Sequence, residues 1–303
     1  MIVYKEFASI ERDLGFSIRT LYALSNNIDK HYQKVLIPKS DGSKRKLSFP
    51  DPVRKKVQRS IENNILVQYP VSRYAKAYKM GSSVQKNALP HVGKKKLLKL
   101  DIEGFFDHIL YSEVKETVFY GEKFSEPIRI LLTVLCYYKD SLPQGAPTSP
   151  AITNILMYDF DEAIGEFCGE RKIEYTRYCD DMTFSGDFDE REIIDLVKGE
   201  LRKLGLFLKK RKTAVVPATK RQTVTGIVVN DKLNITKDYR KKIRKEIYYI
   251  KKFGIDDHLK RIGVSDKKRY VRSIDGRIAF VLQTTPDNCE FKEYKKLLAE
   301  YRL

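Results

Sequence analysis

The segment Tyr175-Thr-Arg-Tyr-Cys-Asp-Asp-Met-Thr-Phe-Ser185 places two adjacent carboxylates, Asp180 and Asp181, between two apolar stretches. Ile173, Tyr175 and Arg177 alternate with Glu174, Thr176 and Tyr178, and strand character resumes at Met182, which predicts two strands joined by a tight turn that carries both aspartates. Like charges held together raise each other's pKa and are unfavourable unless a cation compensates them. Divalent ions that prefer hard oxygen ligands would make the cluster favourable. The turn is therefore a candidate metal site.

A third carboxylate, Asp101, follows an apolar stretch earlier in the chain. Leu97, Leu98 and Leu100 precede it, which predicts a strand that ends at Asp101 and leaves its carboxylate at the rim of a sheet. If folding brings Asp101 to the Asp180 turn, the three carboxylates could hold two ions about 3.5–4 Å apart, the arrangement that promotes in-line displacement at phosphorus. Spacing alone does not show that they meet, so the bare pattern leaves metal binding open.

The charge balance favours a polyanionic partner. The 303 residues include 58 Lys and Arg against 40 Asp and Glu, a formal net charge of +18, and 42% of them are hydrophobic. That apolar content predicts a folded interior and excludes a disordered basic tail. Because neutralising phosphates releases counterions, nucleic acid is the leading partner class. An anionic membrane surface and a merely soluble basic protein are the alternatives.

Neither a membrane span nor a cysteine-based site is predicted. The longest apolar stretch, residues 130–138, is shorter than the ~18 residues that a span requires, and the first residues lack a signal-peptide core. The cysteines, at positions 136, 168, 179 and 289, are scattered, without the clustering of a zinc site. We expect a cytoplasmic protein with reduced thiols and no membrane partner.

The N-terminal part has two different patterns. Apolar residues recur at helical spacing from Ile10 to Leu24, which predicts a helical extension. Between Val35 and Phe49, two apolar stretches flank Ser40-Asp41-Gly42-Ser43, which predicts a hairpin. Lys39, Lys44, Arg45 and Lys46 would make the tip of this hairpin basic. Pro52 then fits the first position of an amphipathic helix that carries Val53, Val57, Ile61 and Ile65.

Two further segments are predicted to be helical. Ser149-Pro150 fits an N-cap followed by proline at the first helical position, and apolar spacing continues to Phe167, which predicts one core-packed helix. Residues 232–252 are strongly basic, with an apolar stripe at helical spacing. We expect this basic helix to bind RNA through Lys241, Lys242 and Lys245. A solvated charged face on a structural helix is the alternative.

Three motifs in this order resemble the A, B and C motifs of reverse transcriptases. They are Asp101-Ile-Glu-Gly-Phe-Phe106, Leu142-Pro-Gln-Gly-Ala-Pro-Thr-Ser-Pro150 and Tyr178-Cys-Asp-Asp181. Three ordered motifs are far more specific than one. The resemblance is closest to the bacterial retron reverse transcriptases and covers about residues 30 to 250. It rests on Lys39-Ser-Asp-Gly-Ser-Lys-Arg45 followed by Pro50, on Asn87-Ala-Leu-Pro-His91 and on Val224-Thr-Gly226.

The resemblance implies a metal site and a proton donor. Asp101, Asp180 and Asp181 match the residues that hold two catalytic Mg²⁺ ions, with the Ile102 backbone carbonyl nearby. Lys212 resembles the lysine that protonates the leaving pyrophosphate, although the basic run 209–212 leaves the choice of position open. Cys179 stands where many relatives carry alanine. Because the position varies and Cys is small, this departure leaves the expected activity unchanged.

The resemblance also implies a nucleotide site. Arg45 matches the fingers arginine that grips the triphosphate, and its planar guanidinium suits phosphate oxygens. Phe106 matches the aromatic steric gate against a ribose 2′-OH, with Phe105 as the better core candidate. Gln144 and Gly145 match the loop that lies against the incoming nucleotide. Asn87 and His91 are assigned no chemistry, and we expect them to be a hydrogen-bonded structural pair.

The fold implied is an α+β right-hand polymerase with fingers, a palm of antiparallel sheet plus helices, and a helical thumb. We expect an N-terminal helical extension at residues 1–33 and fingers at 34–99, with 111–142 returning to the fingers. The palm is expected at 100–229 and the thumb at 230–303.

The function implied is RNA-directed DNA synthesis from deoxynucleoside triphosphates. A cognate structured non-coding RNA of the msr–msd type would be template and primer, and priming from an RNA 2′-OH would give a branched RNA–DNA product, msDNA. Retron reverse transcriptases act in antiphage defence with a separate effector or toxin protein. The residues after Val229 are too few for an RNase H domain, so we expect host RNase H to degrade the template.

Two alternatives remain. One is another bacterial reverse transcriptase type, diversity-generating or CRISPR-associated, against which Val224-Thr-Gly226 argues. The other is a catalytically silent RNA-binding scaffold, which the presence of all three aspartates disfavours.

Overall fold

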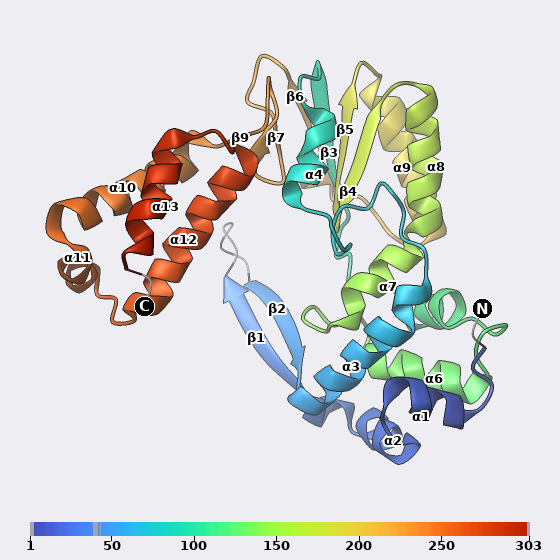
Figure 1. Cartoon of the computed structure of the whole chain (residues 1–303). Coiled ribbons are helices and arrows are strands. Elements are labelled where there is room, and N and C mark those ends of the chain that lie inside the picture. Colours follow the sequence, from blue (N-terminus) through green and yellow to red (C-terminus); the bar gives the residue numbers. More distant parts are fainter. Residues whose placement is uncertain (1–2, 39–41, 43, 302–303) are drawn as a thin grey trace. The chain divides into compact units, whose positions relative to one another are not determined.

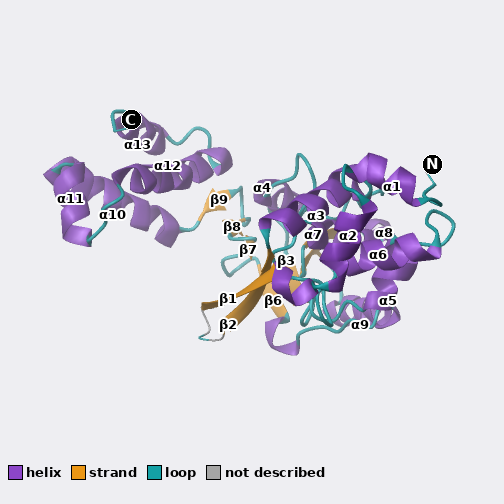
Figure 2. Ribbon diagram, turned by 90° about the horizontal axis from the view of Figure 1, so that it is seen from below, coloured by secondary structure: helices purple, strands orange, loops and turns teal. Residues whose placement is uncertain are grey.

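The chain folds into two compact units, each assembled from segments that are separate in the sequence. The computed structural model describes residues 3–38, 42 and 44–301. Unit 1 comprises Met1–Ser82, Leu98–Phe184 and Phe188–Val215, and unit 2 comprises Ser83–Leu97, Ser185–Asp187 and Val216–Leu303. The architecture mixes helices with short sheets, as the α+β expectation requires (Figures 1 and 2). The limits of fingers, palm and thumb stay a prediction.

A four-stranded sheet, most of which lies in unit 1, carries the candidate aspartates. Its order is β4 (Glu174–Tyr178), β5 (Asp181–Gly186), β3 (Lys96–Asp101) and β6 (Ala214–Pro217). The predicted strands are confirmed, and the apolar residues of β3 are buried. Since β3 ends at Asp101 and its neighbour β5 begins at Asp181, the sheet itself brings two of the carboxylates together.

Helices of unit 1 pack beside this sheet. α8 (Tyr158–Glu170) contacts both β4 and α9 (Glu190–Lys203). The expected single helix after Ser149 is wrong. α7 (Thr148–Leu156) begins two residues before the expected first helical residue, Pro150, and ends where Met157 departs from helical geometry, at φ −89° and ψ 7°. The Ser149 hydroxyl does not cap a helix, because it donates to the Pro143 carbonyl at 2.9 Å.

The N-terminal elements match the predicted patterns with small departures. α1 (Phe7–Leu14) and α2 (Ile18–Asn26) are separate helices, because Gly15 adopts φ +73° between them. The 3₁₀ helix η1 (Ile28–His31) leads into β1 (Tyr32–Pro38), which pairs antiparallel with β2 (Lys44–Pro50) in the register Val35↔Leu47. The hairpin is therefore confirmed. Of its predicted turn and tip, Lys39, Ser40, Asp41 and Ser43 lie outside the described residues.

α3 (Pro52–Asn64) follows the hairpin as predicted. The Asp51 carboxylate caps it by accepting a hydrogen bond from the Arg54 amide at 2.7 Å. Val57 and Ile61 are fully buried, whereas Val53 is exposed and does not belong to the apolar face. The remaining elements of unit 1 are η2 (Leu66–Gln68), α5 (Tyr111–Glu113), the π-helical η4 (Val114–Val118), α6 (Glu126–Cys136) and η5 (Lys210–Lys212). Apart from η5, which buries no residue, these helices share one continuous core with the sheet.

Unit 2 combines a small sheet with a helical bundle. Its elements are α4 (Val84–Ala88), η3 (Leu89–His91), the sheet β7 (Thr223–Val224), β8 (Ile227–Val228) and β9 (Asn234–Ile235), and the helices α10 (Lys237–Phe253), α11 (Ile255–Ile262), α12 (Lys267–Thr284) and α13 (Cys289–Ala299). Ile243, Ile247 and Ile250 are buried in the bundle core, which confirms the predicted stripe of α10.

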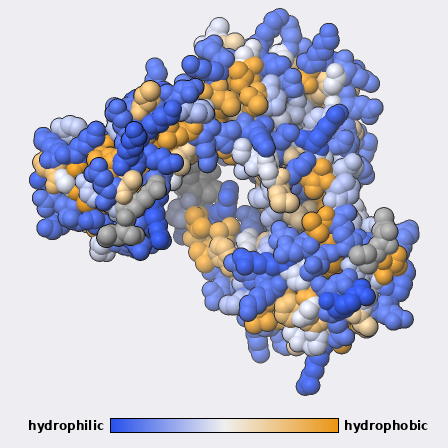
Figure 3. All heavy atoms as spheres, in the orientation of Figure 1, coloured by the Kyte–Doolittle hydropathy of each residue, from blue (hydrophilic) through white to orange (hydrophobic). Residues whose placement is uncertain are grey.

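The visible surface of each unit is largely hydrophilic, as the composition predicts (Figure 3). Within the described ranges, no helix is long and apolar enough to cross a bilayer.

Candidate active site

Asp101, Asp180 and Asp181 line one cavity of about 1080 Å³ in unit 1. Asp101 is 3% exposed at the end of β3. The Asp180 carbonyl accepts a hydrogen bond from the Ile102 amide at 3.1 Å, so the turn is attached directly to the end of β3. Asp180 lies on the two-residue turn Cys179–Asp180, whereas Asp181 already belongs to β5, which begins one residue earlier than the expected Met182. Folding therefore closes the separation that the sequence left open.

The carboxylates influence one another's ionisation. The pKa of Asp181 is raised to about 6, first because the surrounding protein excludes water from the carboxylate and then because Asp180 and Asp101 place like charge beside it. The raised pKa means that the charged form of Asp181 is disfavoured beside the other two carboxylates. A cation bound there would relieve the repulsion.

Lys212 is the member of its basic run whose side chain reaches the aspartates. Its Nζ contacts the Asp101 carboxylate. Partial burial lowers the pKa of Lys212, but the hydrogen bond to Asp101 and the charges of Asp181 and Asp180 outweigh that effect and raise it. Lys209 also lines the cavity, where its backbone amide donates to the Asp101 carbonyl at 2.8 Å. The geometry thus favours Lys212, as the family resemblance implied.

The donor set fits a divalent cation, although the carboxylates are not preassembled as a metal cage. Among the residues that the structure describes, no three His, Cys, Asp or Glu side chains converge into a group that could hold a metal ion. The Lys212 ammonium supplies the positive charge beside Asp101. Carboxylate and carbonyl oxygens are nevertheless the ligands that Mg²⁺ prefers. The Asp101–Ile102 and Asp180–Asp181 segments offer them around one cavity.

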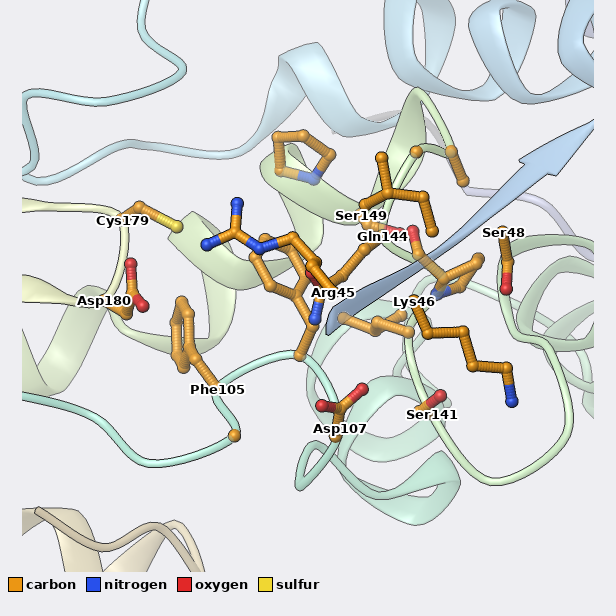
Figure 4. A pocket seen from close by; sticks show the side chains of 18 of the residues that line it. Arg45, Lys46, Ser48, Phe105, Asp107, Ser141, Gln144, Ser149, Cys179 and Asp180 are labelled. Carbon is orange, nitrogen blue, oxygen red and sulfur yellow. Dashed lines mark hydrogen bonds between the residues drawn. The ribbon is translucent and has the colours of Figure 1, made fainter. Parts of the chain in front are cut away.

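The candidate nucleotide residues line the same cavity. Arg45 projects from β2, Phe106 lies five residues after Asp101, and Gln144 and Gly145 form the loop before α7. Figure 4 shows Arg45, Gln144 and Asp180 around this hollow. The structure therefore brings the metal and nucleotide candidates, drawn from distant segments, into one place.

Phe105 is more deeply buried than Phe106, as the sequence predicted, but the cause is not the alternation of a strand. Phe105 is 3% exposed and Phe106 is only half-buried, so Phe105 is the core residue of the pair. Residues 103–107 form turns rather than a strand, and the two rings meet edge-on with centroids 5.5 Å apart. The alternation of a strand therefore does not separate them.

The Gln144–Gly145 loop is held tightly against the hairpin. The Ser48 amide donates to the Gln144 carbonyl at 2.9 Å. Gly145 has φ +123°, and a Cβ there would lie 2.9 Å from Cδ1 of Phe49. The position requires glycine for both reasons, backbone conformation and space.

Sequence reasoning missed several residues of the cavity wall. Lys55, Arg59 and Glu62 reach it from α3, and Tyr78 and Asp107 reach it from loops. Lys55 and Arg59 are four residues apart and so lie on one side of α3. Basic residues on the polar face of this helix could therefore have indicated that it borders the cavity. Nothing in the local pattern marks Tyr78.

The remaining candidates lie in unit 2. Lys241, Lys242 and Lys245 are exposed on α10, as RNA binding and the solvated-face alternative both require. Asn87 and His91 are buried and hydrogen-bonded: the Asn87 amide lies 3.4 Å from the Thr225 hydroxyl, and His91 Nδ1 lies 2.6 Å from the Ser185 hydroxyl. Their positions agree with a structural role.

Comparisons with known proteins agree with this geometry. A family model described as reverse transcriptase (RNA-dependent DNA polymerase) matches residues 37–229. The chain is 31% identical over 239 residues to the retron Ec86 reverse transcriptase of Escherichia coli, covering 77% of this chain and 74% of the relative. It is 26% identical over 312 residues to the retron Mx65 reverse transcriptase of Myxococcus xanthus, covering 95% and 70%.

Among solved structures, the chain resembles a foamy viral protease-reverse transcriptase in complex with double-stranded DNA. The TM-score is 0.50 at 15% identity, and the match covers 90% of this chain and 41% of that chain. At this identity the likeness supports the fold alone, a right-hand polymerase.

Proposed function

Because this chain belongs to the bacterial retron reverse transcriptases, and is thus an RNA-directed DNA polymerase, we propose that it copies part of a cognate structured RNA into single-stranded DNA. Synthesis starts from a 2′-OH of that RNA, which gives a branched RNA–DNA product. The observation that carries the proposal is the convergence of three separate motifs on one cavity.

In this proposal Asp101, Asp180 and Asp181 hold two Mg²⁺ ions, with the Ile102 carbonyl nearby. Bound there, the ions would lower the pKa of the attacking hydroxyl and offset the charge of the leaving pyrophosphate. The burial of Asp101 and the like-charge crowding around Asp181 support the assignment.

The incoming nucleotide contacts cavity residues other than the aspartates. Arg45 pairs with phosphate oxygens through its guanidinium, which the exposed position of that side chain on β2 allows. Phe106 crowds a ribose 2′-OH and so favours deoxynucleotides, while Gln144 and Gly145 form the surface beneath the nucleotide.

Lys212 serves as the proton donor to pyrophosphate. A lysine amine is protonated at neutral pH, and the contact of Lys212 with Asp101 places that proton at the edge of the metal site. RNA is held in part by Lys241, Lys242 and Lys245, whose exposure allows them to meet phosphates.

The wider role follows from the family. We propose that host RNase H removes the copied template. The complex of this protein with its RNA–DNA product then acts in antiphage defence together with a separate effector protein.

Sequencing the nucleic acid that co-purifies with the protein tests the proposal. We expect a short RNA joined at an internal 2′-OH to single-stranded DNA complementary to part of the same transcript. The Asp180→Asn/Asp181→Asn variant is the control and should carry the RNA without DNA. Unbranched DNA copied from an unrelated transcript would instead indicate another reverse transcriptase type. RNA without DNA on the wild-type protein would indicate a silent scaffold.

A further inference from the structure

A buried ion pair lies directly behind the aspartate turn. Arg177 on β4 and Asp161 on α8 are both 0% exposed. Arg177 donates from Nε to Asp161 Oδ1 at 2.8 Å and from Nη2 to Oδ2 at 2.6 Å, and the Tyr175 hydroxyl donates to the same Oδ1 at 2.8 Å. Replacing a buried ion pair with apolar residues of similar volume is often neutral or stabilising. Stability alone therefore does not account for charges at this position.

The same guanidinium reaches the backbone of the turn. Its Nη1 donates to the Cys179 carbonyl at 3.0 Å, and its Nη2 lies 3.3 Å from Asn154 Oδ1. Asn154 in turn donates to the Ala77 carbonyl at 3.0 Å. The planar fork of arginine can serve three such partners at once, whereas a lysine ammonium cannot reproduce that geometry.

The backbone of Arg177 is also clamped. Its amide donates to the Tyr74 carbonyl at 2.9 Å, and its carbonyl accepts from the Lys76 amide at 2.8 Å. The Tyr74 ring occupies the space next to Gly165 of α8, where an added Cβ would lie 2.0 Å from a ring atom. Arg177 is thus fixed from the helix side and from the segment beside β4.

The turn needs such support because its conformation is unfavourable. Cys179 adopts φ +61°, a left-handed conformation that costs a non-glycine residue about 1–2 kcal/mol. Its carbonyl accepts from Arg177, and the next carbonyl, that of Asp180, accepts from the Ile102 amide at 3.1 Å. The two peptide groups that flank the Asp180 side chain are therefore both held by hydrogen bonds.

We infer that Arg177 is a positioning residue for DNA synthesis: it fixes the Cys179 peptide and thereby the direction of the Asp180 and Asp181 carboxylates. The inference rests on the proposed role of those carboxylates in holding Mg²⁺. Without the hydrogen bond, the turn relaxes from its left-handed conformation. The displaced carboxylates then bind Mg²⁺ more weakly.

Two variants separate positioning from stability. Arg177→Lys keeps a positive charge for Asp161 but loses the simultaneous reach to Cys179. Asp161→Leu/Tyr175→Phe/Arg177→Met removes both buried charges and the Tyr175 hydroxyl together. Because it leaves no unpaired charge in the interior, it should fold even if Arg177→Lys does not.

Arg54→Lys is the matched control. Arg54 is also a fully buried arginine that donates to backbone carbonyls, those of Leu24 at 3.0 Å and Leu135 at 3.0 Å, but it does not line the cavity. For each protein we would measure the melting temperature, kcat and KM for single-nucleotide incorporation, the midpoint of the Mg²⁺ dependence, and RNA affinity without Mg²⁺.

We expect kcat to fall and the Mg²⁺ midpoint to rise, each by about tenfold or more, in every folded variant at position 177. RNA affinity should stay within about twofold of wild type, since none of the substituted residues is among the lysines proposed to bind RNA. Arg54→Lys should lower the melting temperature and leave the Mg²⁺ midpoint unchanged. A folded variant at position 177 with wild-type kcat and Mg²⁺ midpoint would overturn the inference.

The proposed function fails in a different way. If Asp180→Asn/Asp181→Asn incorporates nucleotides as fast as wild type, the carboxylates are not the metal site, whatever the Arg177 variants do.

Discussion

Gly145→Ala should displace the nucleotide loop, because the position has neither the backbone freedom nor the space for a side chain. At φ +123° an alanine is strained by about 1–3 kcal/mol. Its Cβ would also lie 2.9 Å from Phe49 Cδ1 and 3.1 Å from the Ser48 carbonyl oxygen. Such overpacking typically costs a further ~1–3 kcal/mol, so the total is about 2–6 kcal/mol.

The cost of the substitution can appear in two ways, as lower stability or as weaker nucleotide binding, and both can be measured. If the loop stays in place, chemical denaturation shows the decrease in the free energy of unfolding. If the loop moves away from β2, the Ser48–Gln144 hydrogen bond breaks and the KM for deoxynucleotides rises. Adding Phe49→Ala removes the ring clash but neither the φ strain nor the close approach to Ser48. The loss of unfolding free energy in the double variant should therefore be about 1–2 kcal/mol smaller than the sum of the losses in the two single variants.

Gly199→Ala is the matched control for this prediction. Gly199 lies within α9, where an added Cβ would meet nothing within 4 Å, so alanine should be neutral or stabilise by up to about 1 kcal/mol. Wild-type stability together with a wild-type KM in Gly145→Ala would show that the loop tolerates a side chain at this position.

Three further variants each test one assignment. Phe106→Ala should raise ribonucleotide incorporation about tenfold or more relative to deoxynucleotides, because the ring no longer crowds the 2′-OH; unchanged sugar discrimination would remove the gate assignment. Replacing Lys241, Lys242 and Lys245 with Gln should weaken RNA binding. The slope of log affinity against log salt concentration should fall in magnitude by about 0.7–0.9 for each phosphate that is no longer neutralised. An unaltered slope would mean that these lysines form only a solvated face. Lys212→Ala should slow single-turnover incorporation about 100-fold, and a wild-type rate would exclude it as the proton donor.

Local patterns in the sequence predicted the elements that carry the motifs. The apolar residues before Asp101, the alternation before Tyr178 and the stripe of α10 each depend on side chains close in sequence, and each corresponds to an observed element. The Asp101–Asp181 convergence was expected from the family resemblance. The structure adds the physical cause, which is that β3 and β5 are neighbours in one sheet.

Other features depend on interactions that no local pattern encodes. Ser149 has the composition of an N-cap, but its hydroxyl is used by the Pro143 carbonyl and the helix starts before it. Arg177 reads as a polar residue in an alternating strand, yet it is fully buried because Asp161 approaches it from α8. A buried charge can be recognised only when its partner is known.

The most direct test of the central claim is Mg²⁺-dependent, RNA-templated incorporation of deoxynucleotides by the wild-type protein and by Asp180→Asn/Asp181→Asn. We expect extension by wild type and none by the variant, which should still bind RNA with wild-type affinity because the substitutions leave its basic helix unchanged. Extension at the wild-type rate by the variant would mean that Asp180 and Asp181 do not hold the catalytic Mg²⁺ ions, since neutral amides lack the negative charge with which carboxylates bind Mg²⁺.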